Sequence, residues 1–261
     1  MQNEVIVAFA LSMIAGLATT IGGAFVVFAD FRNKKILTSA LGFSGAVMVM
    51  VSLAELFPEA VETLGTAYGD FWGEILVCAV ILIGIISVIL AEKFFKGSEQ
   101  KGAKLLSGEV RETKSLIRLG FLLMGTMMLH NLPEGVATFM ASYKNLEVGI
   151  AITIAIALHN IPEGIAVSMP IFYGTKSKGK AIFIAFLSGI SEPFGALLAY
   201  LLLMPFISDV VLGIIFAFVC GIMLAISFAE LLPKSSKDDG FASSYGVVLG
   251  ITFMMCAMSL I

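Results

Sequence analysis

Long apolar stretches of about twenty residues alternate with short polar gaps along the whole chain. A stretch of that length can cross the hydrocarbon core of a bilayer as one helix. The pattern predicts eight membrane-spanning helices, at residues 4–28, 36–57, 72–95, 117–142, 147–172, 180–204, 209–232 and 243–260. These helices use most of the chain, so we expect an all-α polytopic membrane protein. Residues 1–261 would form a single transmembrane domain, with one longer cytoplasmic loop at about 96–116.

The composition excludes an ordinary soluble domain. The chain is 59% hydrophobic and only 13% charged, and its mean hydropathy is +1.01, whereas a soluble domain carries about a quarter charged residues. The first apolar stretch is not expected to be a cleavable signal peptide, because it lacks a basic start and is about as long as the others. Cys78, Cys220 and Cys256 lie singly in different stretches, so neither a disulfide framework nor a thiolate metal cluster is expected.

The basic residues predict the orientation of the chain in the membrane. Fifteen of the sixteen Lys and Arg residues fall in alternate gaps, after the first, third, fifth and seventh stretches, and only Lys144 lies in the other set. Lys and Arg in short loops stay on the cytoplasmic side. Both termini are therefore expected to be extracellular.

Two pairs of segments nearly repeat each other within the chain. LHNLPEGVA at 129–137 and LHNIPEGIA at 158–166 lie on the fourth and fifth predicted helices. SLAELFP at 52–58 and SFAELLP at 227–233 lie on the second and seventh. The pairs predict that helices 1–3 recur as helices 6–8 with inverted topology, around a central pair formed by helices 4 and 5. Inverted repeats are typical of transporters, whose sites lie near mid-membrane.

Polar side chains gather in the doubled motif. Both histidines of the chain lie in it, and on a helix each histidine shares a face with the glutamate four residues later. An asparagine follows each histidine, and the sixth predicted helix adds one more glutamate. Two imidazoles, two amide oxygens and three carboxylates together predict a metal site. Its residues are His130, Asn131, Glu134, His159, Asn160, Glu163 and Glu192.

Three carboxylates inside membrane helices need a partner. Each charged carboxylate costs roughly 2.5–3.5 kcal/mol there, so three cost on the order of 8–10 kcal/mol. No basic residue lies in the predicted helix interiors, which leaves protonation or a bound cation. Imidazole with carboxylate suits Zn²⁺, Fe²⁺ or Mn²⁺ and suits Cu⁺ poorly. Pro133, Pro162 and Pro193 each free a backbone carbonyl as well, which lipid tolerates only beside protein or a water-filled cavity.

Three other acids are weaker candidates for a cation path. Glu55 lies near the outer end of the second predicted helix, Glu59 lies just beyond it, and Glu230 lies near the inner end of the seventh. They could guide a cation into and out of the membrane, or they could be ordinary interfacial charges. The outer gap around Glu59 has no Lys or Arg, so its negative charge would concentrate cations.

The doubled HNxPEG motif, followed by a glutamate on the next helix, resembles the ZIP (Zrt/Irt-like) metal transporters, and most of all their bacterial ZupT/GufA-type branch. The likeness extends to the helix count, the outer termini and the long gap between the third and fourth helices. It implies that the seven motif residues bind a transported metal. It also implies import of Zn²⁺, with Fe²⁺, Mn²⁺, Co²⁺ or Cd²⁺ as further substrates, by a homodimer in the bacterial inner membrane. Many relatives carry a histidine-rich loop in that gap, and residues 96–115 contain no histidine.

A divalent cation that moves inward carries two charges and gains free energy from the membrane potential, so transport needs no energy from a nucleotide. The absence of a GxxxxGK[ST] nucleotide-binding motif agrees with this. The expected partners are divalent metal ions and the lipid bilayer, with no prosthetic group and no nucleic acid. The main alternative is a membrane-embedded metalloenzyme that uses the same His/Glu cluster, although the sequence has no HExxH. An exporter, and a proton-linked carrier of organic solutes, are further alternatives. The solute carrier leaves the paired imidazole–carboxylate sets unexplained.

Overall fold

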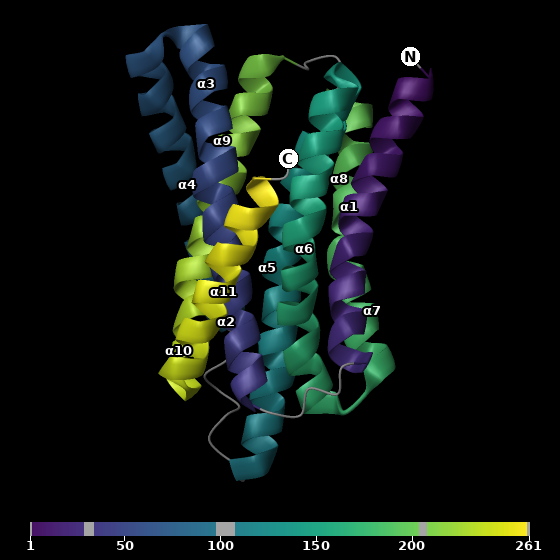
Figure 1. Cartoon of the computed structure of the whole chain (residues 1–261), viewed down its shortest axis with the longest axis vertical. Helices are drawn as coiled ribbons and strands as arrows, with labels where there is room; N and C mark the ends of the chain where they lie inside the picture. The colour runs from purple at the N-terminus through teal and green to yellow at the C-terminus, as the bar shows by residue number, and fades with distance from the viewer. Residues whose placement is uncertain (1, 29–33, 98–107, 204–207, 260–261) are drawn as a thin grey trace.

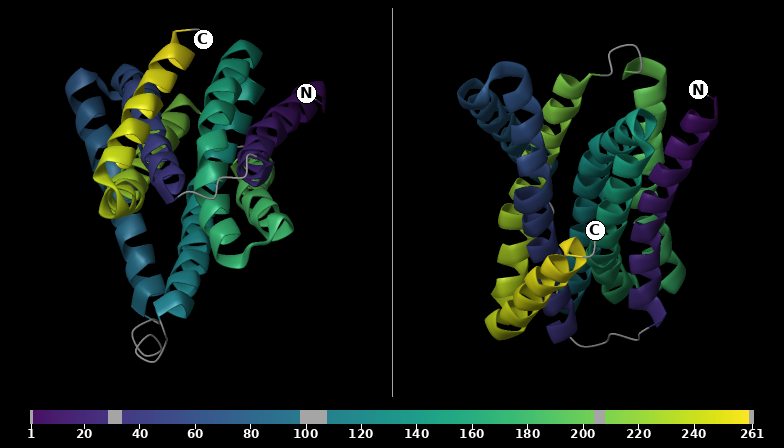
Figure 2. Two further views of the ribbon diagram at one scale, coloured as in Figure 1. Left: turned by 60° about the horizontal axis from the view of Figure 1, so that its bottom comes forward. Right: turned by 45° about the horizontal axis from the view of Figure 1, so that its top comes forward.

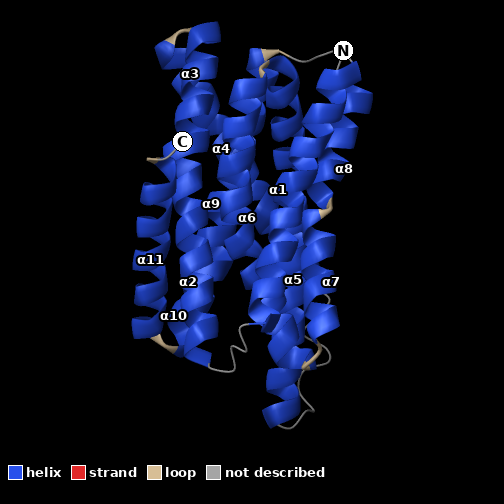
Figure 3. Cartoon of the chain, turned by 45° about the vertical axis from the view of Figure 1, so that its right-hand side comes forward, coloured by secondary structure: helices blue, strands red, loops and turns tan. Residues whose placement is uncertain are grey.

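The computed structural model describes residues 2–28, 34–97, 108–203 and 208–259, and these residues form helices joined by short loops (Figure 3). The first half contains α1 (Gln2–Phe28), α2 (Lys34–Val51), η1 (Ser52–Leu56), α3 (Phe57–Tyr68), α4 (Asp70–Gly97) and α5 (Gly108–Lys144). The second half contains α6 (Leu146–Thr175), α7 (Lys178–Gly189), α8 (Ser191–Leu198), η3 (Ala199–Leu203), α9 (Asp209–Ile226), η5 (Ser227–Leu231), α10 (Leu232–Asp238) and α11 (Gly240–Met258). The elements named η are π-helical turns.

Eight helical segments of the described chain are long and apolar enough to cross a membrane. They lie at Asn3–Val27, Thr38–Tyr68, Asp70–Leu90, Thr113–Lys144, Leu146–Thr175, Lys178–Leu202, Asp209–Lys237 and Gly240–Met258. Each contains most of one predicted span. The predictions of an all-helical fold and of eight membrane-spanning helices are therefore confirmed.

The second span continues further toward its C-terminal end than its apolar pattern indicates. Helix α3 follows η1 without a break, and the wider π-helical turn accommodates Pro58 in the first turn of α3. The helix ends at Gly69, whose φ of 82° lies in the left-handed region that favours glycine. Glu59 and Glu62, expected in an extramembrane gap, therefore lie on a helix.

The fourth span also begins earlier than expected. Helix α5 begins at Gly108, so residues 108–116 of the predicted cytoplasmic loop are helical. This segment is rich in charged residues, and an exposed helix can extend beyond the membrane without an apolar face. The rest of the predicted loop that follows α4, residues 98–107, lies outside the described residues.

The helices form two neighbouring groups (Figures 1 and 2). We call α1, α5, α6, α7 and α8 the site bundle, and α2, α3, α4, α9, α10 and α11 the flanking bundle. The two bundles meet where α2 packs on α6 and where α5 packs on α9. The doubled motif of α5 and α6 lies in the site bundle.

Helix contacts within each bundle come in matched pairs. In the site bundle, α1 packs on α6, and α8 packs on α5. In the flanking bundle, α2 packs on α11, and α9 packs on α4. Exchanging the first three spans for the last three, and α5 for α6, turns the contact of α1 with α6 into that of α8 with α5. The same exchange turns the contact of α2 with α11 into that of α9 with α4. This packing supports the inverted repeat, which stays a prediction, as does the outer position of both termini.

The repeated SLAELFP and SFAELLP segments fold alike. Each begins with a π-helical turn, in which a backbone N–H donates to the carbonyl of Ser52 or Ser227 five residues earlier. Each of these serines also donates its hydroxyl to the carbonyl four residues before it, at 2.7 Å to Met48 and 2.8 Å to Met223. A proline follows each turn and lacks the N–H that a regular α-helix would use there, which favours the wider turn.

Candidate metal centre

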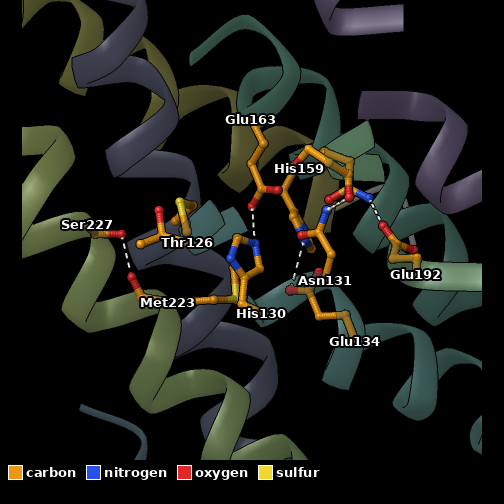
Figure 4. A network of polar contacts seen from close by, with 12 residues as sticks. Thr126, His130, Asn131, Glu134, His159, Glu163, Glu192, Met223 and Ser227 are labelled. Carbon is orange, nitrogen blue, oxygen red and sulfur yellow. Dashed lines mark hydrogen bonds and ion pairs between the residues drawn. The ribbon is translucent and has the colours of Figure 1, made fainter. Parts of the chain in front are cut away.

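The doubled motif stays helical in spite of its prolines. Pro133 lies inside α5 and Pro162 inside α6, and both helices continue through them. The His and Glu side chains of the two copies lie close to one another (Figure 4), and an Asn follows each His. All six are at most 2% exposed. The structure therefore brings the two copies together, as the sequence predicts.

Each histidine faces the glutamate of the other copy rather than that of its own. His130 Nε2 lies 3.0 Å from Glu163 Oε1, and the two share a hydrogen bond. His159 Nε2 lies 3.4 Å from Glu134 Oε1. The sequence alone places each histidine beside the glutamate four residues later. The cross-pairing comes from the antiparallel contact of α5 with α6, and it makes the two copies one site.

The two asparagines are anchored to neighbouring helices through their amide nitrogens. Asn131 Nδ2 donates to the carbonyl of Ser188 in α7, at 3.3 Å. Asn160 Nδ2 donates to the carbonyl of Ala15 in α1, at 2.9 Å. Backbone carbonyls carry no signal in a sequence, so these anchors could not be predicted. They turn each amide so that its oxygen is available as a ligand.

Glu192 completes the predicted set. It lies at the start of α8, immediately after the helix is interrupted at Ile190, and it is fully buried. Asn160 Nδ2 also donates to Glu192 Oε1. The seven predicted residues therefore lie in one buried cluster formed by α5, α6 and α8.

This cluster contains an excess of hydrogen-bond acceptors. Within the described part of the chain, several of its buried atoms have no hydrogen-bond partner. They include Asn131 Oδ1, Glu134 Oε2, Asn160 Oδ1, Glu163 Oε2 and Glu192 Oε2. Buried polar atoms normally find partners, and oxygen atoms with imidazole nitrogens are ligands that Zn²⁺ accepts. The chemistry of the cluster therefore fits a divalent transition metal.

The histidines and glutamates pair with each other in this arrangement. Among the described residues, no three His, Cys, Asp or Glu side chains are grouped closely enough to hold one ion. Metal binding would replace the imidazole–carboxylate contacts with metal–ligand bonds. Metal and protons then compete for the same nitrogen and oxygen atoms, because the ligands bind metal when deprotonated.

The glycines of the two PEG sequences set how closely the helices approach. A Cβ built on Gly135 would overlap the backbone oxygen of Glu192, and one built on Gly164 would overlap the backbone oxygen of Thr19. The neighbouring helices have glycines at the same contacts. A Cβ on Gly195 of α8 would overlap the backbone oxygen of Leu132 in α5, and a Cβ on Gly22 of α1 would overlap the backbone oxygen of Ile161 in α6. These contacts seat α8 and α1 directly beside the cluster. The motif therefore encodes helix packing as well as ligands.

A cavity of about 420 Å³ lies between η1, α3 and the cluster. Glu55, Glu59 and Glu62 line it on one side, and Glu134 and His159 line it on the side of the cluster. We call it the outer cavity, because the predicted orientation puts α3 on the outer side of the membrane. At about 30 Å³ per water, this outer cavity has room for on the order of ten waters. Glu62 was not among the predicted site residues. Its spacing of three and seven residues from Glu59 and Glu55 puts all three on one helix face, and that spacing could have identified it.

Glu230 is not part of the outer cavity. It is buried in η5, is 1% exposed, and forms an ion pair with Lys234 one turn later. Its predicted place on the inner part of the path stays a prediction.

Comparison with known proteins gives a consistent result. The sequence profile of a family described as "ZIP Zinc transporter" matches residues 98–258. The chain is 44% identical to "Zinc transporter ZupT" of Lysinibacillus sphaericus, over the whole of both chains. It is 40% identical to a protein of the same name in Clostridium perfringens, over 99% of this chain and 97% of the relative. For the Streptococcus mutans protein of that name the identity is 38%, over 100% of this chain and 99% of the relative.

Proposed function

The chain belongs to the ZIP zinc transporter family, and from this premise we propose that it moves Zn²⁺ into the cytoplasm through the cluster on α5, α6 and α8. Its relatives are named zinc transporters over its full length, so the protein is a multi-pass membrane transporter of divalent metal and not an enzyme. Zinc is its substrate. The alternative of a membrane metalloenzyme is thereby set aside.

One observation supports the proposed route above the others. In the described part of the chain, buried carboxylate and amide oxygens without hydrogen-bond partners are concentrated where α5, α6 and α8 meet, within three membrane-spanning segments. Such an arrangement is costly in a membrane unless the carboxylates are protonated or a cation binds to them, and the amide oxygens, which do not take up protons, favour the cation. We infer that His130, Asn131, Glu134, His159, Asn160, Glu163 and Glu192 bind the metal, and that Glu134 and Glu163 can bridge two ions.

The proposed path begins in the outer cavity. Glu55, Glu59 and Glu62 attract a hydrated cation, which passes to Glu134 and His159 on the side of the cluster. The ion then binds between α5, α6 and α8 and leaves toward Glu230. The proposal also includes a homodimer in the bacterial inner membrane, and Fe²⁺, Mn²⁺, Co²⁺ or Cd²⁺ as further substrates.

Membrane potential is the proposed driving force. An elementary charge that crosses the membrane gains about 2.3 kcal/mol per 100 mV, so two charges gain about 2.8 kcal/mol at 60 mV. That free energy corresponds to roughly hundredfold accumulation. We therefore expect proteoliposomes with an inside-negative potential of about 60 mV to accumulate radiolabelled Zn²⁺ to that extent. Equal uptake at zero and inside-negative potential would exclude this driving force.

Removing charge from the outer cavity should slow the capture of metal without changing the site. In Glu59→Gln and Glu62→Gln, we expect the KM for zinc uptake to rise about three- to tenfold at low ionic strength and the maximal rate to stay the same. The difference should shrink as salt screens the charges. Glu74→Gln is the matched control, because Glu74 is an exposed outer acid of α4 that does not line the cavity. A KM that changes equally in all three variants would argue against the path.

A further inference from the structure

A second cleft, of about 510 Å³, lies between α6 and α11. Its walls are apolar and include Ile150 and Ile154 of α6 and Phe253 of α11. Glu147, in the first turn of α6, is the one charged residue among those that line it. The two helices contact each other at few positions, and the side chains of Ile150 and Ile154 are exposed. The cleft is therefore open to the surroundings of the protein.

The surroundings of the cleft define what can fill it. Both helices are membrane-spanning segments, and Ile150 and Ile154 are 42% and 45% exposed. An apolar cleft that stays empty in hydrocarbon loses the dispersion contacts that its walls could make. The material available at this depth is lipid, and a lipid acyl chain matches the apolar lining.

Glu147 defines the headgroup. Its side chain is exposed, and its backbone N–H donates to Asn145 Oδ1 at 2.9 Å, which places it in the capped first turn of α6. The end of a membrane-spanning helix lies at the level of lipid headgroups. A carboxylate there attracts an ammonium headgroup and repels an anionic one.

The cleft adjoins the outer cavity. Ala151 lines both of them, and Ala257 lines the cleft while its neighbour Met258 lines the cavity. A chain bound in the cleft would lie against the wall between the acidic cavity and the bilayer. It would close the seam between α6 and α11 against leakage of water and ions.

We propose that the cleft between α6 and α11 binds one phospholipid with an ammonium headgroup, its acyl chain along Ile150, Ile154 and Phe253 and its headgroup beside Glu147. The lipid completes the wall of the outer cavity. The binding site itself does not depend on the proposed metal path. Its tests measure lipid rather than zinc, so the two proposals can fail separately.

Native mass spectrometry of the purified full chain tests the headgroup. The protein is exposed to an equal mixture of phosphatidylethanolamine and phosphatidylglycerol before analysis. We expect it to retain phosphatidylethanolamine in preference, and Glu147→Gln to reduce this preference about five- to tenfold. Glu74→Gln, which removes an exposed acid that does not line the cleft, should leave the preference unchanged. Equal retention of the two lipids by the natural protein would overturn the proposal.

Filling the cleft tests the place of the acyl chain. Ile154→Trp puts a large side chain in it, whereas Ile83→Trp makes the same change at an exposed position of α4 outside the cleft. We expect Ile154→Trp to lose one retained lipid and Ile83→Trp to lose none. Thermal unfolding of both variants checks that they fold. The same loss in both variants would overturn the proposal.

The native cysteines provide an independent measurement. Cys256 lines the cleft, and Cys78 on α4 is also exposed but lies outside it. In detergent, added phosphatidylethanolamine should slow the alkylation of Cys256 by a lipid-soluble maleimide about fivefold and leave Cys78 unchanged. An unchanged rate at Cys256 would overturn the proposal. So would protection that rises with protein concentration in the absence of lipid, because it would assign the cleft to a second copy of the chain.

Discussion

Zinc uptake is expected to fall at least about hundredfold when Glu134 or Glu163 is replaced by alanine. Each carboxylate is buried and faces the histidine of the other motif copy, at 3.4 Å and 3.0 Å respectively. Its loss removes a ligand, a negative charge that offsets the metal charge, and the partner of an imidazole. Uptake of radiolabelled Zn²⁺ into proteoliposomes measures the effect, and calorimetric zinc titration of the detergent-solubilised protein measures binding.

Folding provides the control for this prediction. Alanine removes a buried carboxylate from the membrane, but it also leaves the facing imidazole without its partner. We expect both variants still to unfold in one cooperative transition in detergent, which shows that they are folded. Glu74→Ala, at an exposed outer position of α4, should keep full uptake. Substantial uptake by a folded Glu134→Ala or Glu163→Ala variant would contradict the proposed site.

Replacing Gly164 with valine is expected to destabilise the fold and to abolish zinc uptake. A side chain at Gly164 meets the backbone oxygen of Thr19, and a backbone cannot move aside as a flexible side chain can. Helix α1 would have to shift, and Asn160 would lose its bond to the carbonyl of Ala15. Overpacking of this kind costs about 3 kcal/mol or more, which lowers the Tm of a chain of this size by roughly 6–12 °C.

A glycine in open space is the matched control. Gly125 lies on α5, and a Cβ added to it meets nothing within 4 Å. Gly125→Ala should keep uptake and Tm, because alanine is the better helix former. Gly135→Ala, next to the backbone of Glu192, should behave like a milder Gly164→Val. Thermal unfolding and zinc uptake are measured on all three variants. They show whether a substitution is harmful only where the glycine contacts another backbone or at any glycine of these helices. Equal behaviour of Gly125→Ala and Gly135→Ala would contradict the packing argument.

The path residues show where a sequence is ambiguous. Glu55 and Glu59 could be read as a cation path or as interfacial charges, because a hydropathy pattern does not indicate which side of a helix faces a cavity. The fold continues α3 beyond the apolar stretch and puts both on the wall of the outer cavity with Glu62. Glu230 forms an ion pair with Lys234, one helical turn later. An ion pair of this kind is compatible both with a place on the cation path and with an ordinary interfacial charge.

The sequence by itself determined the eight spans, the doubled motif and the identity of the seven clustered residues. It could do so because the bilayer imposes a constraint along one dimension: each span needs an unbroken apolar length, so a polar residue inside one stands out. His130 and Glu163, in contrast, are 33 residues apart in the chain. Only the tertiary structure decided that they pair, that Asn131 and Asn160 are held by backbone carbonyls, and that a cavity reaches Glu134. These features depend on how helices face one another, and that is settled by close contacts such as those at Gly135 and Gly164.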